Sequence, residues 1–323
     1  MINPEMQLVE DLDRVEVKAM RDGYGEVLLE LGKDERMWVV VADLMESTRV
    51  KDFAKHYPDR FVEMGIAEQN MMGVAAGMAL EGKIPFVNSF ACFSPGRNYD
   101  QLRVSVCVGK ANVKVVGGHA GAGNGEDGAN QQSFEDVGMV RSLPNLVVVS
   151  PADYEQVKRA TRAIVVHEGP VYMRMTAPAR PVVTSKMTPF VLGKAQVLRR
   201  GGEVGLIVSG AMVYEGLRAA EELSGKVDVE VINIHTIKPI DESEIIRVAQ
   251  KCKRVVVAEE HQIIGGLGSA VAEVLVKEGV GVKMRMVGMS DVFGESGKPE
   301  ELLVKYGMSK EVIIKAIREL VGK

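Results

Sequence analysis

The sequence predicts an α/β protein made of two units, each a parallel sheet covered by helices on both faces. Apolar segments of strand length alternate with segments of helical period along nearly all 323 residues. The strand segments are almost continuously apolar, as in MWVVV at residues 37–41, which is typical of strands buried on both faces. A proline-rich break at residues 176–190 separates the two units, and we interpret it as an interdomain linker.

The composition, with 46% hydrophobic and 26% charged residues, is typical of a soluble globular protein. A net charge of -4 gives no reason to expect nucleic acid or an anionic membrane as a partner. Residues 1–18 carry charges of both signs without an apolar core, and no stretch reaches the length of a membrane span, so we expect a cytoplasmic protein. Cys92, Cys107 and Cys252 lack metal-ligand spacing and are expected to be reduced thiols.

In the first unit the pattern predicts a helix over residues 10–31, followed by alternating strands and helices. The predicted strands are residues 37–41, 61–66, 84–93, 112–117, 146–149 and 171–175, and the predicted helices are 67–80, 97–108, 132–143 and 152–167. In the second unit the predicted strands are 203–208, 227–234, 254–258 and 282–287, and the predicted helices are 212–223, 242–252, 268–277 and 310–320.

The stretch FVEMGIAEQNMMGVAAGMAL, residues 61–80, places Glu68 where a short strand passes into a helix. The small and apolar residues that follow allow this helix to pack tightly against another surface. A glutamate in a first helical turn is also explained as a solvated helix cap. The local pattern alone therefore leaves both interpretations of Glu68 open.

Polar residues also follow two other predicted strands. Asp43 and Ser47 come just after residues 37–41, at the end of the strand where open parallel sheets bind ligands, although such residues also form turns. The strand 112–117 leads into GGHAGAGNGEDGANQQSFED, in which His119, Glu126 and Asp127 alternate with glycines. Glycine-rich backbone can approach a ligand closely, so the pattern favours a ligand loop over a flexible linker.

The segment EEHQIIGGLGSAV, residues 259–271, contains a second glycine-rich turn. Its spacing is not that of a dinucleotide-binding fingerprint, which requires a fixed set of glycines between a strand and a helix. The sequence therefore favours a tight turn into a helix over a phosphate loop.

Together, GIAEQNM at residues 65–71, the segment from Phe90 to Phe93 and HAGAGNGEDG at residues 119–128 resemble the pyrimidine-binding half of transketolase. The resemblance covers nearly the whole chain. It implies a mostly parallel pyrimidine-binding domain at residues 1–185 and a smaller, mixed-sheet C-terminal domain at residues 190–323. Both belong to the thiamine diphosphate superfamily.

The resemblance implies that Glu68 hydrogen-bonds to the pyrimidine ring of thiamine diphosphate and favours its reactive imino tautomer. Phe90 and Phe93 would form the aromatic wall beside that ring, and Asp43 would be a further cofactor-binding residue. The third aromatic residue of typical transketolases is absent here. Glu68 and His119 are the candidate catalytic residues.

The resemblance also implies a substrate site, in which Arg21, Ser47, His119 and Arg174 line a phosphate-binding region and Asp127 bonds a substrate hydroxyl. The planar guanidinium group of arginine suits phosphate. By itself, Arg21 on a helix is as well explained as a solvated side chain, and Arg174 in a strand can pair with any acid.

Two departures from the family pattern bear on function. Transketolases commonly carry Thr-His-Gln where this chain has Asn130, Gln131 and Gln132, and glutamine at position 131 cannot shuttle a proton as histidine can. The chain also lacks the Gly-Asp-Gly pattern that holds Mg²⁺ and the diphosphate. We therefore expect an N-terminal transketolase subunit to supply them, in a heterotetramer of two copies of each subunit.

The first functional hypothesis is a C-terminal transketolase subunit, which moves a two-carbon ketol unit from a ketose phosphate to an aldose phosphate. The second is the beta subunit of a 2-oxoacid dehydrogenase complex, against which His119, Asp127 and Arg174 argue, because a lipoyl acceptor needs no sugar-phosphate site. The third is a non-catalytic subunit that keeps the fold for assembly.

Overall fold

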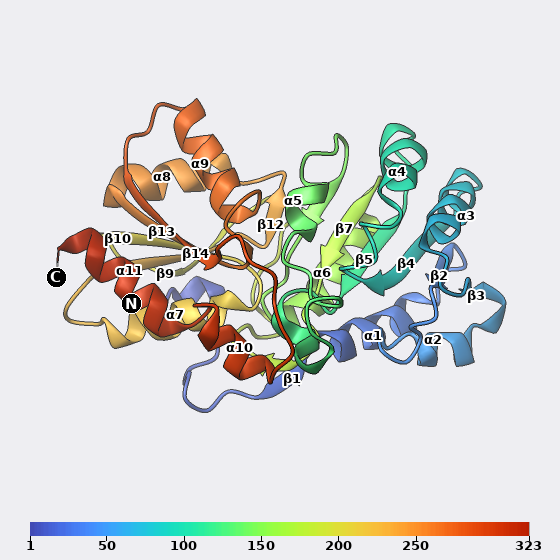
Figure 1. Cartoon of the computed structure of the whole chain (residues 1–323), viewed down its shortest axis with the longest axis horizontal. Coiled ribbons are helices and arrows are strands. Elements are labelled where there is room, and N and C mark those ends of the chain that lie inside the picture. The colour runs from blue at the N-terminus through green and yellow to red at the C-terminus, as the bar shows by residue number, and fades with distance from the viewer. Residues whose placement is uncertain (323) are drawn as a thin grey trace.

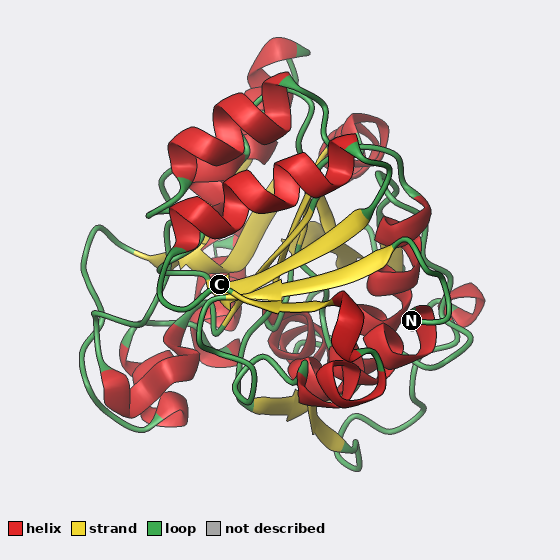
Figure 2. Ribbon diagram, turned by 90° about the vertical axis from the view of Figure 1, so that its right-hand side faces the viewer, coloured by secondary structure: helices red, strands yellow, loops and turns green. Residues whose placement is uncertain are grey.

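Two sheets organise residues 1–322, the part of the chain that the computed structural model describes (Figure 1). A seven-stranded sheet is built mainly from the first half of the chain, and a five-stranded sheet from the second half. Helices cover both faces of each sheet, as the view in Figure 2 also shows. The predicted α/β class with two doubly wound sheets is confirmed.

The seven-stranded sheet has the order β12-β6-β7-β5-β4-β2-β3. Every pairing in it is parallel except that of β12 with β6, so the sheet is mostly parallel as expected. Its strands are β2 (Met37–Val41), β3 (Phe61–Glu63), β4 (Ile84–Phe90), β5 (Lys114–Gly118), β6 (Val147–Val149), β7 (Val171–Arg174) and β12 (Thr236–Lys238). Strand β12 comes from the second half of the chain.

The helices of this unit divide between the two faces of the sheet. One face packs against α3 (Glu68–Leu80), the π-helix η3 (Leu102–Val108) and α5 (Asp136–Val140). The other face packs against α1 (Met20–Leu31), α2 (Lys51–His56) and α6 (Tyr154–Val166). Because both faces are covered, the strands are mostly apolar, as their sequences indicate.

The five-stranded sheet has the order β14-β13-β10-β11-β9, with only β9 antiparallel, so it is the smaller mixed sheet. Its strands are β9 (Gln196–Arg199), β10 (Val204–Val208), β11 (Val229–Asn233), β13 (Arg254–Gln262) and β14 (Lys283–Met289). Helices α7 (Met212–Glu222) and α11 (Lys310–Val321) cover one face. Helices α8 (Glu242–Cys252) and α9 (Leu267–Lys277) cover the other.

The predicted helix over residues 10–31 is wrong in its first half, because the helix begins only at Met20. Residues Val17–Ala19 form β1, which pairs antiparallel with β8 (Ala179–Pro181). The partner strand lies more than 150 residues away, so the helical period of residues 10–19 gave no sign of it. Strand β8 also gives the predicted linker a fixed structure, and Val182 and Val183 that follow it are buried.

Several other boundaries differ from the prediction. The predicted helix 97–108 is α4 (Tyr99–Gln101) followed by the π-helix η3, and the helix predicted over 132–143 is only the short α5. Several short elements were not predicted, namely α2, β9, β12 and α10 (Pro299–Lys305), and the 3-10 helices at Pro4–Met6, Pro58–Arg60 and Ala122–Asp127. Such short segments carry too few residues to show a period.

Candidate functional site

The predicted site residues gather at one edge of the seven-stranded sheet. Strands β3, β2, β4 and β5 are consecutive neighbours and parallel, so their carboxyl ends lie at the same edge. Glu68, Asp43, Phe90 and His119 each follow or end one of these strands. Asp43 and His119 have left-handed backbone, with φ of 57° and 58°. Strained backbone of this kind is concentrated at functional sites.

A pocket of about 420 Å³ lies at this edge. Five predicted residues line it: Arg21, Ser47, Phe90, His119 and Asp127. The other lining residues are Gly123, Asn124, Gly125, Glu126, Ala177, Pro178 and Pro299. The glycine-rich loop therefore forms a pocket wall, and Pro299 brings the second half of the chain into the same wall.

Three rings form a stack beside the pocket. The ring of His119 lies 3.9 Å from that of Phe90 with an interplanar angle of 29°, and Phe93 stacks on Phe90 at 5.8 Å and 15°. Offset stacking of this kind fixes ring orientation beyond simple burial. The structure thus brings together the two predicted phenylalanines and the histidine.

Arg21 and His119 contact each other in the pocket. Arg21 Nη1 lies 3.2 Å from His119 Nε2 and 3.3 Å from the carbonyl oxygen of Ser47. Because arginine only donates, Nε2 is the acceptor and the imidazole is neutral. Burial, and then the charges of Arg21 and Arg49, lower the pKa of His119 to about 3. In this pocket Arg21 is therefore the cation, and His119 is a neutral ring.

Glu68 is buried, with 3% of the residue exposed, which excludes the solvated-cap interpretation. Its Oε1 accepts a hydrogen bond from Arg97 Nη1 at 2.9 Å and from Ser89 Oγ at 3.5 Å. The guanidinium carbon of Arg97 lies 4.0 Å from the centre of the Phe93 ring. Arg97 thus joins the carboxylate to the aromatic stack. Arg97 was not predicted, because it lies 29 residues from Glu68 and no local pattern links the two.

Five predicted residues do not line the pocket: Glu68 and Phe93, which lie beside the stack described above, and Asp43, Gln131 and Arg174. Asp43 is exposed, and its backbone N–H donates to Glu63 Oε1 at 2.8 Å. The carbonyl oxygen of Gln131 accepts from the side chain of Asn124, inside the loop. Arg174 is buried and donates from Nε to Asp136 Oδ2 at 2.9 Å, so its charge is already neutralised within the chain. Arg174 thus pairs with an acid of its own chain, the alternative that the sequence left open.

Comparison with known proteins identifies the family of this chain. The family model for the transketolase pyrimidine binding domain matches residues 16–181, and that for the transketolase C-terminal domain matches residues 193–313. The chain belongs to the transketolase family.

Relatives within the transketolase family span almost the same length. A putative transketolase C-terminal section from Methanocaldococcus jannaschii is 46% identical over 95% of this chain and 97% of its own. A subunit of 6-deoxy-6-sulfo-D-fructose transketolase (SqwH) from Clostridium sp. (strain MSTE9) is 43% identical over 95% of this chain and 96% of its own. A solved split gene transketolase, described as an inactive beta4 tetramer, has a TM-score of 0.88 and 42% identity over 94% of this chain and 99% of its own.

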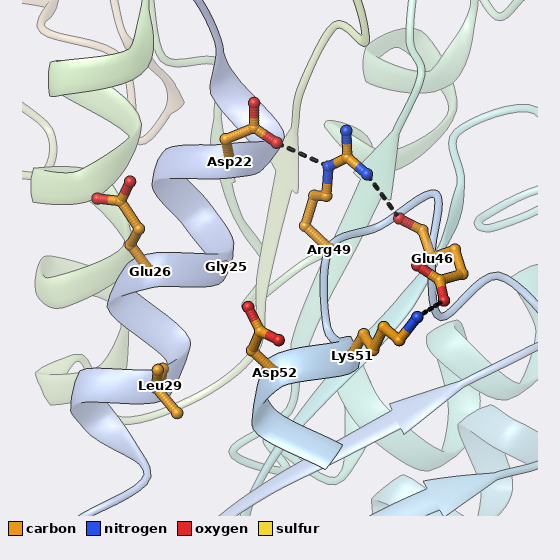
Figure 3. Close-up of a pocket in the computed structure, with 8 residues that line it drawn as sticks. All are labelled: Asp22, Gly25, Glu26, Leu29, Glu46, Arg49, Lys51 and Asp52. Carbon is orange, nitrogen blue, oxygen red and sulfur yellow. Dashed lines mark hydrogen bonds and ion pairs between the residues drawn. The ribbon is translucent and has the colours of Figure 1, made fainter. Parts of the chain in front are cut away.

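A second pocket, of about 340 Å³, lies between α1 and residues 46–52 (Figure 3). Arg49 donates from Nε to Asp22 Oδ1 at 2.7 Å and from Nη1 to the carbonyl oxygen of Glu46 at 3.5 Å. The carboxylates of Glu26 and Asp52 also line this pocket, which makes it unsuited to an anionic ligand. Arg49 nevertheless acts on the first pocket, since its charge adds to burial in lowering the pKa of Arg21, and to burial and Arg21 in lowering that of His119.

Residues 1–322 show neither of two other kinds of site. In that range no helix is long and apolar enough to cross a membrane. The same residues contain no group of three or more His, Cys, Asp or Glu side chains arranged to hold a metal ion.

The glycine-rich turn at residues 259–271 is a helix start, as the sequence favours. Gly266 is the N-cap of α9. The Glu259 carboxylate accepts hydrogen bonds from the backbone N–H groups of Leu267 at 2.7 Å and Gly268 at 2.8 Å. An acidic side chain of the protein itself therefore occupies the position where a phosphate would bind.

Proposed function

We propose that this chain is the C-terminal subunit of a two-component transketolase, which transfers a two-carbon ketol unit from a ketose phosphate to an aldose phosphate. The observation that carries the proposal is the juxtaposition of buried Glu68 and the Phe90–Phe93 stack with a pocket that holds Arg21 and His119. A carboxylate beside aromatic rings suits a heteroaromatic cofactor, and an arginine-lined pocket suits an anionic sugar.

The residues present fit the pyrimidine end of thiamine diphosphate. Glu68 offers a carboxyl group at a desolvated position, and Arg97 joins it to the stack of Phe93 and Phe90. When bound, the cofactor would supply the nucleophilic carbon of the reaction. In this proposal Glu68 holds a proton at the pyrimidine nitrogen, and the aromatic stack orients the ring and excludes water. Asp43, exposed at the end of β2, is proposed to contact the cofactor only in the assembled enzyme.

The pocket supports recognition of the sugar by its anionic end and its hydroxyl groups. Arg21, Ser47 and His119 are proposed to bind the phosphate, and Asp127 to accept a hydrogen bond from a hydroxyl. The relative that acts on a sulfo-sugar shows that anionic groups other than phosphate occur in the family. We therefore leave the particular sugar open, with Gln131 on the loop as a candidate determinant of donor choice.

The surface next to Glu68 supports a partner subunit. Ile66, Leu80 and Val108 are 72%, 77% and 68% exposed, although they are large apolar residues. On α3 an added Cβ at Gly73 or Gly77 would meet no atom within 4 Å, so this helix presents a bare backbone face. Such surfaces are typical of protein interfaces. We propose that an N-terminal subunit carrying the diphosphate and Mg²⁺ docks here and that the assembly is α2β2. In this proposal the domains of this chain are residues 1–185 and 190–323.

The test is reconstitution of the enzyme from its two components. The purified chain alone should show no ketol transfer, and activity should appear with an N-terminal subunit, thiamine diphosphate and Mg²⁺. In that complex Glu68→Ala should abolish turnover while assembly, followed by analytical ultracentrifugation, is unchanged. Activity of the isolated chain would contradict the two-component proposal, and normal turnover of Glu68→Ala would remove Glu68 from the mechanism. A screen of donor and acceptor sugars would then identify the substrates.

A further inference from the structure

A buried carboxylate from the second half of the chain holds the loop that forms the pocket wall. Glu260 lies on β13, is 3% exposed, and accepts a hydrogen bond at Oε1 from the backbone N–H of Ala122 at 3.0 Å. Arg180 Nη2 lies 3.7 Å from the same oxygen and keeps the carboxylate paired inside the protein. Ala122 is the first residue of the turn Ala122–Asp127, whose later residues line the pocket.

The loop and the carboxylate are in direct contact at Gly121. This glycine has φ of 74°, and a Cβ at its position would lie 2.3 Å from Glu260 Oε1. Only a residue without a side chain allows the backbone to approach so closely. The backbone carbonyl oxygen of Glu260 accepts a hydrogen bond from Arg174 Nη1 at 3.2 Å. Both the backbone and the side chain of Glu260 are therefore fixed against the first unit.

A second set of contacts holds the far end of the same loop. The backbone N–H of Gly297 donates to the carbonyl oxygen of Gly125 at 3.2 Å. Gln132 Nε2 donates to the carbonyl oxygen of Glu295 at 3.0 Å, and Pro299 lines the pocket beside the loop. The pocket wall is thus held at two points by the C-terminal half of the chain. Of these contacts, only that of Glu260 is made by a charged side chain buried at the interface.

We propose that Glu260 is a positioning residue for substrate recognition: by holding the N–H of Ala122, it sets the conformation of the loop that carries Asp127 and follows His119. The C-terminal unit then contributes to sugar binding through the shape of this loop, without a catalytic group of its own. The inference rests on the proposed function, since it takes Asp127 and His119 as substrate-binding residues.

The neighbouring residue provides a matched control. Glu259 is 4% exposed, so it is buried to nearly the same extent as Glu260, and its carboxylate also accepts backbone hydrogen bonds. Those bonds hold the N-terminus of α9 rather than the pocket loop. Removal of either carboxylate leaves buried donors unpaired and lowers stability, but only Glu260 touches the loop.

The experiment compares Glu260→Ala, Glu260→Gln and Glu259→Ala in the reconstituted complex. Glu260→Ala should raise KM for the sugar phosphates about tenfold with a smaller change in kcat, because the loop loses its alignment. Glu260→Gln should recover most of the loss, since its amide oxygen can still accept from Ala122. Glu259→Ala should leave KM unchanged, although it should lower Tm by about as much as Glu260→Ala does. An unchanged KM in Glu260→Ala, or an equal rise in Glu259→Ala, would overturn the proposal.

Hydrogen exchange separates this inference from the proposed function. In the purified chain, the amide of Ala122 should exchange faster in Glu260→Ala than in the wild type, and at the wild-type rate in Glu259→Ala. Gly121→Ala, which pushes the loop away from an intact Glu260, should also speed this exchange. If the wild-type complex showed no ketol transfer, the proposed function would fail while the exchange rates still tested the contact. Equal exchange in wild type and Glu260→Ala would overturn the positioning role.

Discussion

Arg97 and Glu68 form an ion pair, with 2.9 Å between Arg97 Nη1 and Glu68 Oε1, in which the carboxylate is buried and the arginine is half-exposed. Arg97 also lies over the ring of Phe93 at 4.0 Å. Ser89 approaches the same carboxyl oxygen. We therefore expect the other oxygen, Oε2, to be the one that meets the cofactor. The arginine fixes the orientation of the acid relative to the aromatic wall.

Arg97→Ala should lower kcat of the reconstituted complex about tenfold, because a buried carboxylate without its partner loses a fixed orientation. Arg97→Lys should have a smaller effect, since it keeps the charge but not the planar group over Phe93. Steady-state kinetics at saturating thiamine diphosphate would measure both. Arg103 is an exposed arginine of the following π-helix, and Arg103→Ala is the control. Equal kcat in the two alanine variants would contradict the prediction.

Arg21→Ala should raise KM for a phosphorylated acceptor about tenfold or more, which corresponds to the loss of one charge-assisted hydrogen bond. Arg21 suits this role because its Nε is buried without a hydrogen-bond partner in the chain and its Nη1 contacts His119. The same acceptor without phosphate should bind almost equally well to variant and wild type. Arg36→Ala, which breaks an exposed pair with Asp34, is the control. An equal loss for both acceptors would place Arg21 outside the phosphate site.

The stability of the chain should depend on pH through His119. Its pKa is about 3 in the folded chain, because of burial and the nearby arginines, against 6.5 ordinarily. As the pH falls, the unfolded chain therefore binds the proton before the folded chain does. The free energy of unfolding should then decrease between pH 6.5 and about pH 3, by up to about 1.4 kcal/mol per pH unit. Urea denaturation of wild type and His119→Gln at several pH values would show a difference that grows only below pH 6.5. Parallel curves would contradict the pKa shift.

Arg174→Met should lower the free energy of unfolding by about 3–5 kcal/mol, because it leaves Asp136 buried without its cation. Asp136 has no exposed surface and also accepts from the hydroxyl of Tyr172 at 2.8 Å. The double variant Arg174→Met/Asp136→Asn should be more stable than Arg174→Met, since no charge is left unpaired. Urea denaturation of the three proteins would measure this coupling. A variant with normal stability and a raised KM would instead support the substrate role expected from the resemblance.

Local pattern predicted the long elements well and the short ones poorly. Helix α8 has the predicted bounds, residues 242–252, because its apolar stripe is clear and the side chain of Asp241 caps its first turn. The three-residue strands β1, β8 and β12 were missed, since each is defined by a partner strand elsewhere in the chain. The segment 10–16 shows the opposite error, in which an apolar period occurs without a helix.

The same distinction holds for the site. Asp43 and Ser47 follow β2 and His119 follows β5, with β4 between these parallel strands, and the carboxyl ends of parallel strands share an edge of the sheet. Arg97 and Glu260 carried no comparable signal. Their partners, Glu68 and Ala122, lie 29 and 138 residues away. For Arg174 the sequence shows the charge but not Asp136 beside it.

The sequence by itself determined the α/β class, the doubly wound sheets and the edge at which the polar residues meet, since these follow from local periodicity and the direction of the strands. Only the tertiary structure decided which charges remain available to a ligand. Arg21 faces the pocket, Arg97 is paired with Glu68, and Arg174 is paired with Asp136. The physical reason is that electrostatic pairing depends on distances of a few ångströms between side chains far apart in sequence, and periodicity does not contain those distances.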